Sequence, residues 1–272
     1  MYLGVDIGGT KTLVASLDDN GVIQEEFRFP TPKMYADFLK QLAENVAKLS
    51  TKDFVAGSVG MPGRVDRTNG VGVAFGNLPW RNVPLRDDLK DIAGCPTLVE
   101  NDAKLAGLSE AQLLKEHEKV LYVTIGTGIG VALTVGGQLD PAISDIGGKE
   151  ILLEHGGKTE AWEEFASGKA IVRQFGKEAD AIDDPEAWKA IAHSIAEGLL
   201  DLIALFEPDI VVLGGGVSTH FDKFGGHLQR YLEHFKNPML TIPPVHAAAR
   251  PEQAVIYGCY DLARSLYGPG AS

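Results

Sequence analysis

Two glycine-containing turns in this sequence have the composition of phosphate-binding loops. One is Gly8-Gly9-Thr10-Lys11 and the other is Gly126-Thr127-Gly128, and each follows a short apolar run. Glycines let the backbone approach an anion closely, and the free N–H groups of such turns form anion-binding concavities. The threonines and the lysine add hydroxyl and ammonium donors. Either turn alone could be a plain tight hairpin, but the pair, with a third glycine run at Gly214-Gly215-Gly216, predicts a phosphate clamp.

Two aspartates stand where strands are expected to end. Asp6 lies beside the first glycine turn, where a carboxylate can hold Mg²⁺ against phosphates, directly or through water. A turn-capping aspartate is the alternative interpretation of this residue. Asn101-Asp102 opens an expected helix, whose N-terminus favours an ionised carboxylate. Asp102 can therefore accept a hydroxyl proton during phosphoryl transfer, although a helix N-cap would use the same residue types.

Other nucleotide and metal motifs fit the sequence poorly. There is no GxxxxGKS or GxxxxGKT segment, which excludes a P-loop. Residues 126–130 superficially suggest a dinucleotide fingerprint, but residues 131–135 continue as a strand rather than a helix, which disfavours a Rossmann dehydrogenase. His220, His227 and His234 recur every seven residues, about two helical turns apart and too far for a shared metal ion.

Strands and helices alternate along the chain, and the candidate residues fall at the ends of strands. Apolar runs predict strands at 2–7, 12–17, 22–29, 54–59, 97–99, 121–125, 131–135 and 210–213. Helical patterns follow Pro32 and recur at about 102–114, 160–177, 185–206 and 252–267. Thr31-Pro32 has the composition of an N-cap followed by proline at the first helical position.

The chain contains an internal repeat. Residues 3–17 align with residues 121–135 without a gap, and both segments read as strand, glycine turn and strand. Such a repeat predicts two lobes, each of which opens with a glycine-tipped hairpin. The charged stretch Glu116-His117-Glu118-Lys119 places the boundary between an N-terminal lobe, residues 1–117, and a C-terminal lobe, residues 118–252.

Composition argues against several classes of protein. The chain has 272 residues, of which 44% are hydrophobic and 23% charged, and its formal net charge of −12 repels nucleic acid. No apolar run approaches the roughly 20 residues that span a bilayer, so no membrane partner is expected. Asp6 interrupts the first apolar run and no basic segment precedes it, which argues against a signal peptide. The sequence holds two cysteines, Cys95 and Cys259, and this favours a reduced, cytoplasmic compartment.

Taken together, these segments resemble the ROK family (repressor, open reading frame, kinase) over nearly the whole chain. Each piece is weakly specific alone, but their order and spacing are highly specific. The matching pieces are Gly4–Lys11, Gly57–Gly63, Gly76–Trp80, Val99–Ala103, Gly126–Gly130, Glu163–Gly168 and Val212–Val217. The resemblance implies an α/β protein with the two-lobed actin-like ATPase (ribonuclease H-like) fold and an active site in the cleft between the lobes. It also implies that the last helix, about 253–267, packs back on the N-terminal lobe.

The resemblance assigns roles to the candidate residues. It implies that Asp102 is the catalytic base, which takes the proton from the sugar 6-hydroxyl as this attacks the γ-phosphate of ATP. The positions that match sugar contacts are Asn77, Asn101, Asp102 and Glu163. The turns at 8–11 and 126–128 match phosphate-binding positions, and residues 214–216 lie where the nucleoside end binds. Mg²⁺ is the expected metal, held by Asp6.

Three departures from the family pattern matter. The family's cysteine-rich zinc loop is absent because residues 149–162 hold no cysteine, so no structural zinc is expected. No helix-turn-helix segment precedes the first strand, which disfavours a transcriptional repressor. The family's Glu-x-Gly-His segment reads Asp145-Ile146-Gly147-Gly148 here, so the histidine that contacts the sugar is replaced by glycine. His155, seven residues further on, is a candidate substitute.

The sequence therefore predicts an ATP- and Mg²⁺-dependent kinase that phosphorylates a hexose, glucose or a close relative, at its 6-hydroxyl. The expected partners are a small-molecule sugar and ATP. The alternative is a sugar- or nucleotide-binding protein of the same fold with weakened catalysis. This alternative is favoured by Asp145 and Gly148, which stand where the family has glutamate and histidine. The acceptor sugar, the choice of ATP over another phosphoryl donor and the formation of a homodimer stay open at this level.

Overall fold

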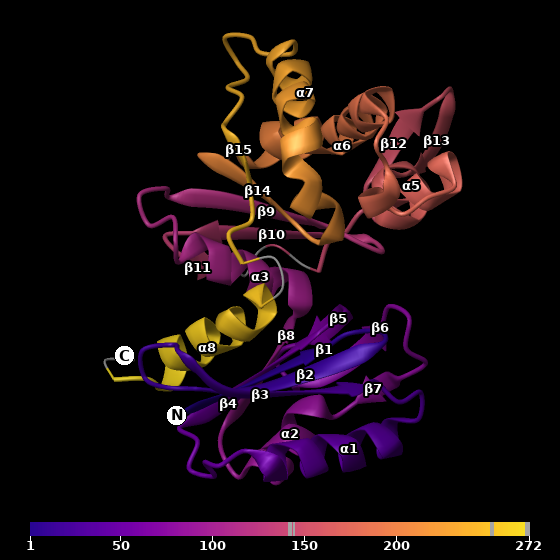
Figure 1. Ribbon diagram of the computed structural model, residues 1–272. Helices are drawn as coiled ribbons and strands as arrows, with labels where there is room; N and C mark the ends of the chain where they lie inside the picture. The colour runs from indigo at the N-terminus through magenta and orange to yellow at the C-terminus, as the bar shows by residue number, and fades with distance from the viewer. Residues whose placement is uncertain (141–142, 144, 251–252, 270–272) are drawn as a thin grey trace. The chain divides into compact units, whose positions relative to one another are not determined.

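A computed structural model describes residues 1–140, 143, 145–250 and 253–269 of the chain (Figure 1). Its internal contacts separate the chain into two compact units. The first unit comprises Met1–Ser109 together with Gln253–Ser272, and the second comprises Glu110–Glu252. The boundary between the units falls inside helix α3 (Asp102–Ala111). The sequence predicted the boundary a few residues later, in the charged stretch at 116–119.

The first unit is built on a five-stranded sheet with the strand order β3-β2-β1-β4-β8. Strands β1, β2 and β3 form an antiparallel meander, whereas β4 and β8 run parallel to β1. The strands are β1 (Tyr2–Ile7), β2 (Lys11–Leu17), β3 (Ile23–Pro30), β4 (Ala56–Met61) and β8 (Thr97–Asn101). The two parallel pairs place the carboxyl ends of β1, β4 and β8 at the same edge of the sheet.

Helices cover both faces of this sheet (Figure 1). Leu3, Val5 and Ile7 of β1 share a core with α1 (Tyr35–Lys48) and α2 (Leu85–Ala93). The alternate residue Tyr2 packs with α8 (Ala254–Tyr267), which lies against β1 and β4. Successive side chains of β1 therefore point to opposite faces of the sheet and contribute to two cores, one on each face.

A second, three-stranded sheet completes the first unit. It contains β5 (Gly63–Asp66), β6 (Val71–Phe75) and β7 (Arg81–Val83), all antiparallel. No apolar run predicted these short strands, because each is only partly buried. The connection between β6 and β7 carries Asn77.

The second unit repeats the central pattern of the first. Its sheet has the order β11-β10-β9-β14-β15, with β9, β10 and β11 antiparallel and β14 and β15 parallel to β9. The strands are β9 (Lys119–Ile125), β10 (Ile129–Val135), β11 (Gln138–Leu139), β14 (Ile210–Gly214) and β15 (Val245–Ala247). Helices α6 (Pro185–Phe206) and α7 (Phe221–Glu233) contribute to its hydrophobic core.

A smaller subassembly of the second unit carries one of the predicted site residues. The hairpin of β12 (Leu152–His155) and β13 (Lys158–Ala161) leads directly into α4 (Trp162–Ala166). Glu163 is the second residue of α4. Helix α5 (Gly168–Phe175) follows, and two short 3₁₀ helices span Ala179–Ala181 and Gly216–His220. Trp162, which is fully buried, anchors the start of α4 because its indole N–H donates to the carbonyl of Ser194 in α6 at 3.0 Å.

Two predicted helices had different outcomes. The helix at 185–206 is confirmed as α6, which starts with Asp184 as N-cap and a proline in its first turn. The single helix predicted at 160–177 is wrong, because Ser167 is extended and caps α5 by accepting from the backbone N–H of Ala170. Within the part of the chain that the structure describes, no helix has the length and apolar character needed to cross a membrane.

The internal repeat holds for the strands but not for the turn between them. In the first hairpin Ile7 pairs with Thr12, so four residues separate the paired positions. In the second hairpin Ile125 pairs with Ile129, so three residues separate them. The gapless alignment would pair Ile125 with Gly130 instead. The second turn is therefore one residue tighter, and equivalent residues of β2 and β10 point to opposite faces of their sheets.

Candidate active site

The carboxyl ends of the parallel strands in the first unit bring two predicted carboxylates to one edge. Asp6 of β1 is in register with Gly60 of β4, and Gly60 is in register with Glu100 of β8. Asn101 and Asp102 follow Glu100 directly. Neighbouring strands lie about 4.8 Å apart, so Asp6 and Asn101 stand roughly 10 Å apart along this edge. The parallel topology therefore brings these candidate residues of the first unit to one edge of its sheet.

The turn at 8–11 is held in shape by a hydrogen bond within it and by contacts with Thr31. The N–H of Gly8 donates to the carbonyl of Lys11 at 3.0 Å, and a β-carbon at residue 8 would lie 2.7 Å from that carbonyl oxygen. The hydroxyl of Thr31 donates to the carbonyl of Gly8 at 2.8 Å and contacts the hydroxyl of Thr12 at 2.9 Å. The interpretation of Thr31 as a helix N-cap is wrong, because Met34 precedes α1 and Thr31 fixes the turn instead.

Asp6 is the titratable group of this edge whose protonation is most affected by its surroundings. Burial raises the pKa of the Asp6 carboxyl to about 6 from an ordinary value of 3.8, and the nearby Lys11 ammonium opposes the rise. Burial makes ionisation of a carboxyl group unfavourable, and a bound cation offsets this cost by stabilising the charged form. Mg²⁺ binds proteins through one or two carboxylates and takes its other ligands from phosphates and water, so Asp6 beside the 8–11 turn fits such an ion.

The sequence left open whether Asn101 or Asp102 caps the helix that follows them. The Asn101 Oδ1 atom accepts from the backbone N–H of Lys104 at 3.2 Å, three residues on, which is the pattern of an N-cap. Its Nδ2 atom donates to the carbonyl of Gly63 at 2.9 Å. Asp102 is the first residue of α3, and its Oδ1 atom accepts from the N–H of Ala103 at 2.8 Å. The N-cap of α3 is therefore the side chain of Asn101.

An ion pair behind Asn101 was missed by the sequence analysis. The Arg67 Nε atom donates to Glu100 Oε2 at 2.7 Å, and a second guanidinium nitrogen contacts Glu100 Oε1. Glu100 Oε1 also accepts from the backbone N–H of Asn101 at 2.7 Å. The Glu100 side chain is 7% exposed, so the bidentate arginine supplies the counter-charge that it needs. A glutamate directly before Asn101 is the one sequence signal that could have indicated this pair.

Asn77 lies next to the first phosphate-type turn. A β-carbon placed on Gly9 would contact the Asn77 β-carbon at 3.5 Å. The aromatic residues Phe75 and Trp80 flank this loop and are both buried, with ring centroids 5.1 Å apart. The Trp80 indole N–H donates to the carbonyl of Lys33 at 2.9 Å. These contacts give the Asn77 loop a fixed base.

In the second unit, adjacent parallel strands again place the glycine segments together. Gly214 of β14 is in register with Thr124 of β9, so the turn at 126–128 and the run at 214–216 leave the same edge of the sheet. The Gly126 N–H donates to the carbonyl of Gly128 at 2.9 Å. Gly215 has a φ of +82°, and a β-carbon there would lie 2.6 Å from the carbonyl oxygen of Ile125. Glycine at 215 therefore lets these two segments approach closely.

Glu163 is tied to the second turn. Its Oε2 atom accepts from the backbone N–H of Ile129 at 2.9 Å, and its Oε1 atom lies 3.7 Å from the Lys149 Nζ atom. A β-carbon on Gly128 would overlap the Glu163 carboxylate, so the absence of a side chain at 128 makes room for it. The Glu163 side chain is 13% exposed. A carboxylate in this position can accept hydrogen bonds from ligand hydroxyls while its orientation stays fixed.

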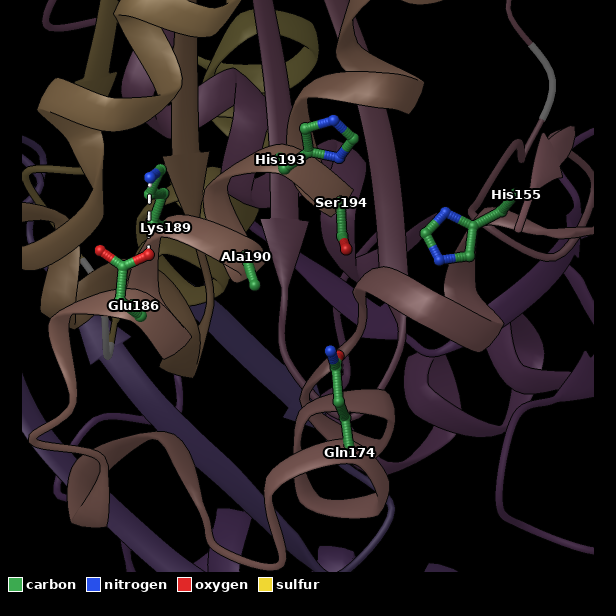
Figure 2. A pocket seen from close by; sticks show the side chains of 7 residues that line it. All are labelled: His155, Gln174, Glu186, Lys189, Ala190, His193 and Ser194. Carbon is green, nitrogen blue, oxygen red and sulfur yellow. Dashed lines mark hydrogen bonds and ion pairs between the residues drawn. The ribbon is translucent and has the colours of Figure 1, made fainter.

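The side chain of His155, the candidate substitute for the missing histidine, contacts Glu197 and Phe165. Its Nδ1 atom is 3.0 Å from Glu197 Oε2, and its ring stacks on Phe165 with centroids 4.0 Å apart. His155 lines a cavity of about 360 Å³ whose other lining residues come from α5 and α6, and Figure 2 draws the side chains of these residues. The lining residues are His155, Gln174, Glu186, Lys189, Ala190, His193 and Ser194. Apart from His155, the lining residues are not ones that the sequence analysis placed in the active site.

The predicted site residues thus form two sets, each assembled within its own unit. The first set is Asp6, Gly8, Gly9, Thr10, Lys11, Asn77, Asn101 and Asp102. The second set is Gly126, Thr127, Gly128, Glu163, Gly214, Gly215 and Gly216. Among the residues that the structure describes, no three or more histidine, cysteine, aspartate or glutamate side chains are arranged to hold a metal ion by themselves.

Comparison with known proteins gives consistent matches along the whole chain. A glucokinase from Streptomyces coelicolor is 26% identical, over 97% of this chain and 98% of its own length. An N-acetyl-D-glucosamine kinase from Salmonella paratyphi C is 30% identical, over 91% of this chain and 94% of its own length. The crystal structure of a ROK family glucokinase from Streptomyces griseus, in complex with glucose and AMPPNP, superposes with a TM-score of 0.81. That protein is 27% identical, and the match covers 97% of this chain and 99% of it.

These matches confirm the predicted fold class, the actin-like ATPase fold that ROK sugar kinases share. The family pattern itself covers residues 2–265, which include both units and the predicted site residues of each. The relatives carry the names of kinases that differ in their acceptor sugar. The match over 2–265 shows that this chain belongs to the ROK family.

Proposed function

We propose that this protein is an ATP-dependent sugar kinase that phosphorylates a hexose, glucose or a close relative, at its 6-hydroxyl. The observation that carries the proposal is the edge of the first sheet. Asp6, a carboxylate suited to Mg²⁺, lies near the end of β1, and Asp102, a carboxylate suited to accept a hydroxyl proton, follows β8 of the same sheet, with the 8–11 turn beside Asp6. Phosphoryl transfer needs these parts: a base, a metal-binding carboxylate and donors for the phosphates.

Each residue has a specific task in this proposal. Asp102 accepts the proton of the 6-hydroxyl as the oxygen attacks the γ-phosphorus. Asn77, Asn101 and Glu163 bind the sugar hydroxyls. The N–H groups of the turns at 8–11 and 126–128, with the Lys11 ammonium, bind the phosphates, and residues 214–216 bind the nucleoside end. Mg²⁺ at Asp6 neutralises phosphate charge when it is bound.

Names of relatives support glucose as the first acceptor to test. Glucokinases from Streptomyces coelicolor and Thermotoga maritima each match 97% or more of this chain, and the Streptomyces griseus structure holds glucose with an ATP analogue. An N-acetyl-D-glucosamine kinase is as similar in sequence, so N-acetyl sugars belong in the test. We also propose a cytoplasmic location, supported by the two free, buried cysteines at 95 and 259.

A binding protein of the same fold with weakened catalysis is the second candidate. The observation that favours it is Gly148, because the structure leaves no room for a side chain at this position without displacing its neighbours. A β-carbon there would lie 2.8 Å from the Ile129 β-carbon and 3.0 Å from the Glu163 β-carbon. The donor that a histidine would have offered to the sugar is therefore absent from residue 148.

A coupled ADP-release assay separates the two candidates. The purified chain is incubated with Mg²⁺, ATP and a panel of hexoses, amino sugars and N-acetyl sugars, with Asp102→Asn as the matched control. We expect at least one neutral hexose to stimulate ADP release in the wild type and not in the control. If no sugar stimulates release while ATP and sugar still bind, as measured by calorimetry, the kinase proposal is wrong and the binding-protein candidate replaces it.

A further inference from the structure

Lys149 occupies a position that neither the sequence motifs nor the proposed roles explain. Its Nζ atom lies 3.7 Å from Glu163 Oε1, and it directly follows Gly148. The turn that carries it is closed by hydrogen bonds from the N–H of Gly147 to Glu150 Oε2 at 3.0 Å and from the N–H of Glu150 to the carbonyl of Gly147 at 3.2 Å. The ammonium group is therefore placed beside the carboxylate that we assign to the sugar.

The backbone around Gly148 explains why the cation comes from the next residue. The Gly148 N–H donates to the carbonyl of Ile129 at 2.9 Å, and its carbonyl accepts from the N–H of Glu163 at 3.0 Å. Both backbone groups are thus fixed between β10 and α4, and the close approach leaves no space for a β-carbon. A side chain that interacts with the Glu163 carboxylate must then come from a neighbouring position. Lys149 provides this interaction as an ion pair.

The two partners differ in exposure in a way that suits ligand binding. The Glu163 side chain is 13% exposed, whereas the Lys149 side chain is 63% exposed. Glu163 is held by the Ile129 N–H as well, so its orientation does not depend on the lysine alone. At 3.7 Å the contact with Glu163 is an ion pair rather than a hydrogen bond, so it leaves the three ammonium hydrogens of Lys149 able to donate to a ligand. Because the Lys149 side chain is largely exposed, its ammonium group is accessible to a ligand that binds at Glu163.

We propose that Lys149 is a specificity-determining residue of the sugar site. Lys149 and Glu163 together bind two neighbouring oxygens of a sugar, one that accepts from the ammonium group and one that donates to the carboxylate. The positive charge of Lys149 disfavours a sugar that carries an ammonium substituent at this position. The substrate class is therefore a neutral hexose with adjacent hydroxyls rather than a protonated amino sugar. This inference rests on the proposed function, because it assumes that Glu163 contacts the sugar.

The experiment compares glucose and glucosamine as acceptors for the wild type, Lys149→Met and Lys149→Arg, at pH 6.0, where the amine of glucosamine is protonated. For Lys149→Met we expect the KM for glucose to rise about 3- to 10-fold, with kcat within about twofold, because a charge-assisted hydrogen bond to the sugar is lost. We expect the ratio of KM for glucosamine to KM for glucose to fall about 3- to 10-fold, because a repulsive charge is removed. Lys149→Arg should keep the wild-type ratio.

Lys158→Met is the matched control, since Lys158 is exposed on β13 of the same subassembly and has no role in the proposal. It should leave both KM values unchanged. If Lys149→Met changes the KM for the two sugars by the same factor, the lysine only supports Glu163 and the specificity proposal is wrong. If no variant releases ADP with any sugar, the kinase proposal fails separately. The same ratio is then taken from sugar dissociation constants, measured by calorimetry, and an unchanged ratio or no sugar binding overturns the Lys149 proposal.

Discussion

At the residue scale, the side chain of Asn101 caps helix α3, so the cap does not require the carboxylate of Asp102, to which we assign the role of base. We expect Asp102→Asn to lower kcat by about 10²- to 10⁴-fold, the usual cost of a lost general base, with ATP binding and the melting temperature nearly unchanged. Steady-state kinetics, ATP calorimetry and thermal unfolding measure the three quantities. Asn101→Ala is the control for capping, and it should lower the free energy of unfolding by about 0.5–2 kcal/mol. Full activity in Asp102→Asn would remove Asp102 from the chemistry.

Asp6 should make the unliganded protein less stable as pH rises. The folded state binds its proton more tightly than the unfolded chain, because the pKa of Asp6 is raised by burial to about 6 from 3.8. The free energy of unfolding therefore falls as pH rises through the interval between these two values. We expect Asp6→Asn to be more stable than the wild type at pH 7.5 by on the order of 3 kcal/mol, since one pKa unit corresponds to about 1.36 kcal/mol. Urea unfolding at pH 7.5 and pH 4.5 measures the difference, which should shrink at the lower pH.

The same substitution should weaken MgATP binding, because the neutral amide is a poor ligand for Mg²⁺. In the wild type, MgATP affinity should increase between about pH 5 and pH 7 as Asp6 ionises. Calorimetry in two buffers with different ionisation heats detects the proton released on binding. An Asp6→Asn variant that is less stable at pH 7.5, or that binds MgATP as tightly as the wild type, would contradict this account.

Sequence reasoning can select candidate site residues where a local pattern defines them. Asp6 and Asp102 stand at strand ends next to glycine or helix signals, and those signals can be read from a few neighbouring residues. The pairs Arg67–Glu100 and Lys149–Glu163 could not be read in this way, because their members are far apart in sequence and meet through tertiary structure. Their partners become visible only when the strands and turns that carry them are placed.

At the scale of elements, the 8–11 turn depends on a residue of the chain that follows β3. The Thr31 hydroxyl donates its hydrogen to the Gly8 carbonyl, so the hydroxyl of Thr12 is the donor in the contact between the two threonines. We expect Thr31→Val to lower the free energy of unfolding by about 1–3 kcal/mol, because Thr12 and the Gly8 carbonyl each lose a buried partner. We also expect the KM for ATP to rise severalfold, with the KM for sugar unchanged.

Thermal unfolding and steady-state kinetics of Thr31→Val, Thr12→Val and the double variant test this dependence. Removing both hydroxyls should cost less than the sum of the single changes, because neither is then left without its partner. Additive losses, or a folded Thr31→Val protein with a wild-type KM for ATP, would show that the turn keeps its shape without this hydroxyl.

Elements were predictable where one local signal dominated. Helix α6 has an N-cap aspartate, a proline in the first turn and a long apolar face, and its bounds were predicted correctly. The break between α4 and α5 follows from a tertiary contact, because the N–H of Gly168 donates to the carbonyl of Gly126 at 2.7 Å. The one-residue difference between the two hairpin turns also cannot be read from the apolar pattern. The strands that follow the turns, β2 and β10, are both mostly buried, so their residue types do not show which face each residue occupies.

At the scale of the whole molecule, the net charge of −12 acts on a polyanionic substrate. We expect the association rate constant of MgATP to rise about two- to fivefold between about 10 and 150 mM ionic strength, because the Debye length falls from about 30 to about 8 Å and screens the repulsion. Stopped-flow measurements at fixed pH test this, and a neutral sugar serves as the control that should not respond. A rate that falls with salt would mean that Lys11 and the glycine turns dominate the field that ATP meets.

The placement of α8 has a consequence for biosynthesis. Helix α8 belongs to the first unit, yet the ribosome makes it after the whole second unit, residues 110–252. At about 5–20 residues per second, the apolar face of β1 and β4 that α8 covers stays open for roughly 7–30 s after Ser109 is made. The second unit is continuous in sequence, and all of its residues are made before α8. The half of the protein that is made first is therefore the half that finishes last, and its uncovered sheet face is the surface that a nascent-chain chaperone would meet.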